Sequence, residues 1–202
     1  MKRDQLDAAA ALLAAALEKD AASVYRFPKE SSRPRQLRWF YGWLLKQALR
    51  SGVVYSTAPD LAGVAIWLPP NARKLSLKGL VAAPISVGVR SALRTALSLN
   101  IMNRDHSRAL AGKHWHLIAV GVDPAYEGEG VEATLMKHAL QRADEDGSAC
   151  YLETTSELGR ENFERFGFVG VEGQGGLRPL PTWGMVRPPW KARPSGQRSS
   201  DS

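Results

Sequence analysis

The stretch from Val122 to Met136 holds the residues whose types and spacing best suit chemistry. Gly128 and Gly130 lie between an apolar run that ends at Val122 and a segment whose apolar residues recur at helical spacing. This order predicts a strand, a turn and a helix, and it aims backbone N–H groups and the helix N-terminus at one place. Because glycine has no Cβ, a ligand can approach the backbone closely there. The pattern predicts a phosphate-binding turn.

Dinucleotide-binding folds also place a glycine-rich turn between a strand and a helix. The run from Gly128 to Ala133 fits their fingerprint loosely. Those folds, however, place the turn in the first βαβ unit, with about five strands still to follow. Only about 70 residues follow Ala133, which leaves room for roughly two or three strands and one or two helices. The late position therefore argues against a dinucleotide fold.

Hydrophobic periodicity predicts the elements that must position this turn. The predicted helices span residues 1–19, 34–50, 131–146 and 158–166. The predicted strands span residues 53–56, 61–68, 113–122, 149–154, 168–171 and 182–186, and the first two form an antiparallel hairpin. Residues 21–32, which contain Pro28, are predicted to be an irregular connection.

The segment 75–110 is mostly helical in pattern and is interrupted by Pro84 and Gly88. Its most apolar part lies between Lys78 and Arg90, well short of the roughly 18 to 20 residues that a membrane span needs. We therefore expect helices inserted before the central strand, forming one side of a cleft, and no membrane partner.

The charge distribution and the cysteine content limit which classes of partner and which cellular compartment fit the sequence. A net charge of +7 admits nucleic acid as a partner. Yet residues 26–50 hold seven bases and one acid, whereas residues 123–165 hold eleven acids and four bases. A nucleic-acid-binding protein would not be acidic at its best anion-binding turn, so the pattern argues against that class. The single cysteine, Cys150, excludes an internal disulfide and favours the cytoplasm.

Length and composition predict one domain over residues 1–187, because 202 residues with 44% apolar content can build one core. Residues 188–202 are rich in proline, basic residues and serine, which is typical of a disordered tail. His114 and His116 share one face of the predicted central strand. Two histidines without a third and fourth ligand predict no metal site.

As a set, three motifs resemble the GCN5-related N-acetyltransferase (GNAT) superfamily. The run Val122-Asp-Pro-Ala-Tyr-Glu-Gly-Glu-Gly-Val131 resembles its acyl-CoA pyrophosphate loop, and Tyr151–Thr155 and Phe163–Phe168 strengthen the resemblance. It covers about residues 35 to 187. It is closest to the branch that includes puromycin N-acetyltransferase, which Trp67–Pro70 also resembles.

The resemblance implies an α/β (α+β) fold of the acyl-CoA N-acyltransferase type. Its central sheet is mixed and largely antiparallel, is flanked by helices, and splits into a V between two parallel strands, here about 114–122 and 149–154. The donor, acetyl-CoA, would bind in the split, with backbone groups of Val120 and Val122 along the pantetheine arm. The residues implied to hold the pyrophosphate through backbone N–H groups are Gly128, Glu129, Gly130, Val131, Glu132 and Ala133.

The resemblance also implies transfer of the acetyl group to the primary amine of a small molecule. This reaction needs a proton acceptor and an N–H donor near the carbonyl oxygen, here a strand N–H near Val120. Glu153 is the first candidate for the acceptor, because the puromycin branch has a Leu-Glu-Thr strand there and desolvation can raise the pKa of a glutamate. His116 is the second candidate, because histidine titrates near neutral pH. Whether the chain forms a homodimer is left open.

Several positions depart from the family pattern. Glu127 stands where glutamine or arginine is usual, Glu129 where lysine or arginine is frequent, and Glu132 where glycine or alanine is usual. Phe163 replaces a tyrosine that commonly protonates the departing thiolate, and Gly159 replaces a frequent asparagine. The alternative hypothesis is therefore a catalytically impaired member that acts as a binding or biosynthetic accessory protein.

Overall fold

The computed structural model describes residues 3–72, 83–110, 112–171 and 182–189. Its helices are α1 (Arg3–Ala16), α2 (Ala21–Arg26), η1 (Glu30–Ser32), α3 (Arg33–Ser51), α4 (Ala83–Val87), α5 (Val89–Ala109), η3 (Pro124–Tyr126), α6 (Val131–Glu145) and α7 (Glu157–Glu164). Its strands are β1 (Val53–Ser56), β2 (Gly63–Leu68), β3 (His114–Val122), β4 (Ala149–Thr154), β5 (Val169–Gly170) and β6 (Trp183–Arg187).

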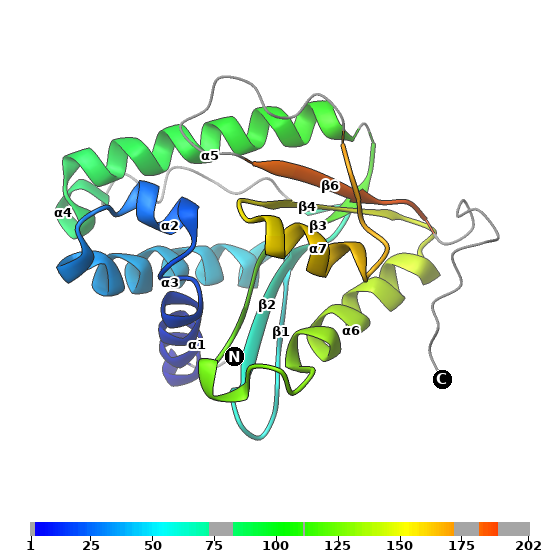
Figure 1. Ribbon diagram of the computed structural model, residues 1–202, viewed down its shortest axis with the longest axis horizontal. Helices are drawn as coiled ribbons and strands as arrows, with labels where there is room; N and C mark the ends of the chain where they lie inside the picture. Colours follow the sequence, from blue (N-terminus) through cyan, green and yellow to red (C-terminus); the bar gives the residue numbers. More distant parts are fainter. Residues whose placement is uncertain (1–2, 73–82, 111, 172–181, 190–202) are drawn as a thin grey trace.

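In these residues, six strands form one sheet in the order β1-β2-β3-β4-β6-β5 (Figure 1). The pair β3–β4 is parallel, and the other neighbouring pairs are antiparallel. The predicted fold class, a mixed and largely antiparallel sheet flanked by helices, is confirmed. The predicted hairpin is also confirmed, since Val54 of β1 pairs with Ile66 of β2.

Side-chain alternation along the strands divides the core into two layers, one on each face of the sheet. On one face, Val64 and Ile66 pack with apolar residues of α1 and α3. On the other face, Trp67 and Trp115 pack with residues of α6 and α7, and their ring centroids lie 6.5 Å apart. Figure 1 shows α1 and α3 separated from α6 and α7 by the sheet.

One segment was predicted wrongly. Residues 21–32, expected to be an irregular connection, form the helix α2 and the short helix η1. The Asp20 side chain caps α2 by accepting a hydrogen bond from the Ala22 N–H at 2.9 Å, and this contact sets where the helix begins. A helix of 6 residues is too short to show hydrophobic periodicity.

The inserted segment forms α4 and α5, which meet at Gly88 as predicted, with φ of 83° at that glycine. Residues 75–82, the first part of the predicted insertion, lie outside the described residues. Residues 190–202, which make up most of the predicted tail, also lie outside them. Across the described chain, no helix is long and apolar enough to cross a bilayer.

Candidate active site

The central strand β3 carries a β-bulge. The consecutive β2 residues Ile66 and Trp67 pair with Ala119 and Leu117, so Ile118 is an extra residue in β3. A bulge leaves one residue without a place in the ladder, bends its strand and increases the local twist. The bulge therefore turns the second half of β3 away from its original direction.

The parallel pairing of β3 with β4 ends just before this bulge. Its last pair joins His116 to Tyr151, and within the described chain residues 117–122 have no partner strand on the side of β4. The two strands therefore separate after His116, which is the V-shaped split that the resemblance implied. An extended ligand can pair with the open backbone of β3 as an added strand would.

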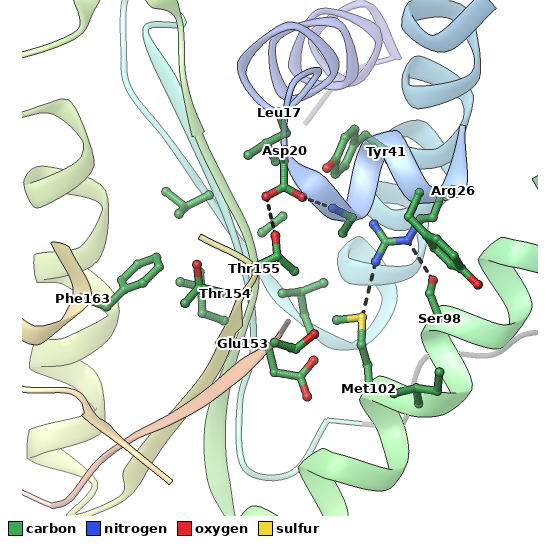
Figure 2. Close-up of a pocket in the computed structure, with 18 residues that line it drawn as sticks. Leu17, Asp20, Arg26, Tyr41, Ser98, Met102, Glu153, Thr154, Thr155 and Phe163 are labelled. Atoms are coloured by element: carbon green, nitrogen blue, oxygen red, sulfur yellow. Dashed lines mark hydrogen bonds between the residues drawn. The ribbon is translucent and has the colours of Figure 1, made fainter. Parts of the chain in front are cut away.

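A cavity of about 180 Å³ opens beside this split (Figure 2). Helices α2 and α5 form one side of it, and β3 and β4 form the other. Its polar lining includes Asp20, Arg26, Tyr41, Ser98, Glu153 and Thr154. Its apolar lining includes Met102, Leu117, Val120 and Phe163. In Figure 2, Arg26 and Phe163 lie on opposite sides, with Glu153 and Thr154 between them.

Glu153 is the predicted proton acceptor that lines the cavity. Its Oε1 accepts a hydrogen bond of 2.8 Å from the hydroxyl of Tyr151, two residues earlier on the same face of β4. Tyr151 is fully buried, so this bond holds the carboxylate in one orientation. His116, the second candidate, packs edge-to-face on Tyr151 at 5.1 Å and is not among the residues that line the cavity.

Two further ionisable groups shape this cavity. The Asp20 carboxylate accepts a hydrogen bond from the Thr155 hydroxyl at 2.8 Å, so it ties α2 to the end of β4. Burial raises the pKa of Tyr41 to about 12. Tyr41 therefore stays neutral at physiological pH and can donate a hydrogen bond, but it does not serve as a base.

The predicted pyrophosphate turn has the expected backbone form. Gly128 and Gly130 have φ of 84° and 74°, in the left-handed region that favours glycine. A Cβ built on either glycine meets no atom within 4 Å, so open space adjoins the turn. Gly130 is the N-cap of α6 and provides no side-chain cap.

The first turn of α6 exposes several backbone donors. Its first intrahelical bond runs from the Thr134 N–H to the Gly130 carbonyl at 3.0 Å. The N–H groups of Val131, Glu132 and Ala133 therefore have no intrahelical acceptor. The Glu129 N–H, also predicted to hold pyrophosphate, instead donates to the Tyr126 carbonyl at 3.3 Å. The turn fits an anionic ligand through its free donors and its open space.

The two β3 residues that were predicted to contact acetyl-CoA, Val120 and Val122, lie in different surroundings. Val120 lines the cavity, just beyond the bulge. Val122 is half-buried at the end of β3 and is not among the residues that line the cavity. Both residues pair with β2 on the other side, at Ala65 and Gly63, so β2 fixes the position of this part of the backbone.

The three acidic residues of the turn differ in their surroundings. Glu127 and Glu129 are exposed, whereas Glu132 is half-buried. Burial raises the pKa of Glu132 above its ordinary value. Water therefore screens the first two carboxylates, and a charged Glu132 would disfavour a bound phosphate most strongly.

Phe163 and Gly159 both lie in α7 but have different neighbours. Phe163 is 8% exposed, lines the cavity and packs edge-to-face on Phe168. A Cβ on Gly159 would collide with Thr154 Oγ1 and lie 2.8 Å from Ser156 Oγ. Ser156 is the N-cap of α7, and its hydroxyl accepts from the Gly159 N–H at 3.0 Å. Glycine at position 159 thus keeps both the cap and the Thr154 hydroxyl in place.

We expect Gly159→Ala to destabilise the protein by about 1 to 2 kcal/mol. Glycine to alanine inside a helix normally stabilises by about 1 kcal/mol, so the collision at Thr154 reverses the usual sign. Urea unfolding followed by circular dichroism measures the change. Glu161→Ala, at an exposed position of the same helix, is the matched control. A gain in stability for Gly159→Ala would contradict this account.

The comparisons with known proteins agree with this geometry. The profile of the acetyltransferase (GNAT) family matches residues 14–168, so the chain belongs to this family. It is an acyltransferase that uses acyl-CoA, as the resemblance implied. The finer resemblance to the puromycin branch stays a prediction.

Three solved structures share the fold. A Corynebacterium glutamicum protein described as histone acetyltransferase HPA2 and related acetyltransferase has a TM-score of 0.68 and 22% identity, over 96% of both chains. The paia N-acetyltransferase of Thermoplasma acidophilum, solved with coenzyme A, has a TM-score of 0.58 and 12% identity, over 93% of this chain and 95% of that one. Mosquito arylalkylamine N-acetyltransferase like 5b has a TM-score of 0.57 and 16% identity, over 93% and 96%.

The structure adds site residues that sequence reasoning missed. Arg26 and Ser98 come from segments that were expected to be a connection and an insertion, and Asp20 lies directly before that connection. An aspartate before a run of helix formers is an N-cap signal, so Asp20 could have been found. Nothing in the local sequence distinguishes Arg26 from the other bases of residues 26–50. Among the described residues, no cluster of three or more His, Cys, Asp or Glu side chains could hold a metal ion.

Proposed function

We propose that this protein transfers an acetyl group from acetyl-CoA to the primary amine of a small molecule, with Glu153 as the proton acceptor. The observation that carries the proposal is the position of Glu153. It lies on β4 beside the point where β3 and β4 separate, and it faces a cavity rather than solvent. A single cysteine, buried in the sheet, supports a cytoplasmic setting.

The open turn and the open edge of β3 would hold acetyl-CoA. N–H groups of Gly128, Gly130, Val131, Glu132 and Ala133 are the donors for the pyrophosphate, and the backbone near Val120 faces the pantetheine arm. When bound, acetyl-CoA supplies a thioester whose carbonyl carbon is open to attack. The donors that remain free in the turn would anchor it without any charged side chain.

Glu153 would accept the proton that the attacking amine loses as its nitrogen bonds to the carbonyl carbon. The carbon–sulfur bond breaks, and the sulfur leaves as a thiolate that takes a proton from water. A strand N–H near Val120 would stabilise the charge on the carbonyl oxygen. Tyr151 keeps the Glu153 carboxylate oriented through its 2.8 Å hydrogen bond.

A second candidate function rests on Phe163 and on the acidic turn. Phe163 has no hydroxyl, so this position provides no proton for the thiolate. Losing a proton donor typically costs about 10² to 10⁴ in rate. An impaired member of the family would bind acyl-CoA or an amine without efficient turnover and would serve as a binding or biosynthetic accessory protein.

Calorimetric titration with acetyl-CoA and with its desulfo analogue tests binding, and an amine screen with thiol detection tests turnover. We expect binding of both ligands and acetylation of at least one primary amine. Binding without turnover of any amine would favour the accessory function. Absence of binding at millimolar ligand would overturn the proposed function.

We expect Glu127→Gln combined with Glu132→Gly to tighten CoA binding by at least about tenfold. At about 6 Å, each carboxylate–phosphate repulsion costs roughly 0.7 kcal/mol in a water-like dielectric and about 3 kcal/mol at an effective dielectric of 20. Because Glu127 is exposed, the lower figure applies there. Glu132 is half-buried and costs at least as much, so two such terms give a change of at least about tenfold. Calorimetry with desulfo-CoA measures the change.

The pH dependence provides a second readout of this prediction. The pKa of Glu132 is raised by burial, so this carboxylate takes up its proton at a higher pH than an exposed glutamate does as the pH falls. As the pH becomes acidic, the affinity of the wild-type protein for desulfo-CoA should therefore rise more than the affinity of Glu132→Gln does. Glu145→Gln, at the far end of α6, is the control. Unchanged or weaker binding by the double variant would refute repulsion at this turn.

A further inference from the structure

Arg26 is a cation buried in the wall of the cavity, only 6% exposed. Its Nε donates to Ser98 Oγ at 2.9 Å, its Nη2 donates to Met102 Sδ at 3.4 Å, and its guanidinium carbon lies 5.1 Å from the centre of the Phe40 ring. All three partners are neutral. Of the carboxylates in the described chain, none lies within 4 Å of Arg26.

Two acids attract Arg26 but are hydrogen-bonded to other partners. Electrostatic attraction to Asp20 and Glu153 favours the charged guanidinium, whereas burial, the larger effect, lowers the pKa of Arg26. Asp20 is bonded to the Ala22 N–H and the Thr155 hydroxyl, and Glu153 to the Tyr151 hydroxyl. The Nη1 group of Arg26 has no hydrogen bond to the residues that the structure describes. A buried charge without a counter-ion in direct contact is costly, so an anion bound to the guanidinium would stabilise this site.

We propose that the amine acceptor carries a carboxylate that binds the Arg26 guanidinium, so that the acceptor is an amino acid or a similar zwitterion. This inference rests on the proposed function and names its substrate class. The ammonium end would lie toward Glu153 and Asp20, and the carboxylate end toward α5. Figure 2 shows Arg26 and Glu153 directed into the same pocket from different elements.

The charge and shape of the lining favour a carboxylate over a phosphate. Arg26 is the one Lys or Arg among the described lining residues. One cation balances one carboxylate, whereas a phosphate near −2 would leave a charge unbalanced close to Asp20 and Glu153. The planar guanidinium fork also matches a carboxylate in a two-bond arrangement.

The proposal predicts how Arg26→Met will behave as a folded protein. The substitution keeps an apolar stem against Phe40 and removes a buried charge that has no contact carboxylate. The melting temperature should therefore stay unchanged or rise, because replacing a buried ionic group by an apolar one is often neutral or stabilising. A purely structural arginine would instead leave a destabilised protein.

The test is calorimetric titration of the full chain with each standard amino acid, its amide and its decarboxylated amine, with and without desulfo-CoA. Turnover with acetyl-CoA is measured on the same panel. Arg26→Met is compared with Arg94→Met. Arg94 also connects α5 to α2, with its guanidinium carbon 5.6 Å from the Tyr25 ring, but it is not among the lining residues.

We expect at least one amino acid to bind, and its amide and amine to bind about 10²-fold more weakly. Arg26→Met should lose this discrimination, and Arg94→Met should keep it. Equal binding of the amide or the amine, unchanged binding by Arg26→Met, or no binding of any amino acid would overturn the inference. If the protein acetylates amines without a carboxylate but does not acetylate amino acids, the proposed function is supported and only the proposed substrate class is refuted. The titrations of amino acids without CoA test carboxylate binding at Arg26 even if the protein does not bind acetyl-CoA.

Discussion

Replacing Glu153 by glutamine should lower kcat/KM for the acetylated amine by about 10² to 10⁴. Glutamine has nearly the same shape and can still accept a hydrogen bond from the Tyr151 hydroxyl, so the cavity stays intact. It cannot take a proton from the amine. The loss should therefore appear in turnover, while calorimetry shows unchanged binding of desulfo-CoA.

The pH–rate profile provides the sharper readout of the same variant. A carboxylate base must be deprotonated, so the wild-type rate should fall as the pH drops and the base takes up its proton. Glu153→Gln should flatten this acid limb. Glu157→Gln, at an exposed position in the first turn of α7, is the matched control. An unaltered profile removes Glu153 from the mechanism, and a limb that flattens only in His116→Gln assigns the base to His116.

Replacing Arg187 by methionine should destabilise the protein by about 3 to 5 kcal/mol. Both terminal nitrogens of Arg187 lie 2.7 Å from the carboxylate oxygens of Asp144, and Nε donates to the Phe166 carbonyl at 3.1 Å. The Arg187 side chain is only 5% exposed. Its loss leaves a partly buried carboxylate and a carbonyl without their donor at the place where β6, α6 and the end of α7 meet.

Thermal and urea unfolding of the variant measure this effect. Arg160→Met is the control, because Arg160, whose side chain is 36% exposed, pairs with the exposed residues Glu157 and Glu164 at 3.9 and 3.5 Å. Surface pairs of this kind contribute only about 0 to 1 kcal/mol. If Arg187→Met and Arg160→Met lost similar amounts of stability, burial would not explain the importance of the Arg187 ion pair. Asp144→Asn should destabilise less than Arg187→Met, since an amide keeps one acceptor for the guanidinium.

Short-range patterns predicted most of the regular elements. The predicted strand 149–154 coincides with β4, and the predicted helix 34–50 differs from α3 by one residue at each end. These segments are long or strongly apolar, so hydrophobic periodicity identifies them. The turn at Gly128 and Gly130 was also predictable, because only glycine adopts its positive φ angles readily.

The candidate site was predictable only in part. Glu153 came from a resemblance, and the structure places it at the cavity. The bulge at Ile118 had no sequence signal, because it depends on how β3 pairs with β2. Helix α2 was missed because its start depends on one capping contact of Asp20.

By itself, the sequence determined the order of most helices and strands, the glycine turn at residues 128–130 and the family, because each rests on residues close together in the chain. Tertiary structure decided the chemistry of the cavity. Arg26 meets Ser98 across 72 residues, and Asp20 meets Thr155 across 135. Such contacts form only when α2, α5 and β4 pack together, and packing alone buries a cation opposite two carboxylates. The expectation that the acceptor carries both an ammonium and a carboxylate therefore depends on the tertiary fold, because no single segment of the sequence contains all the residues that lead to it.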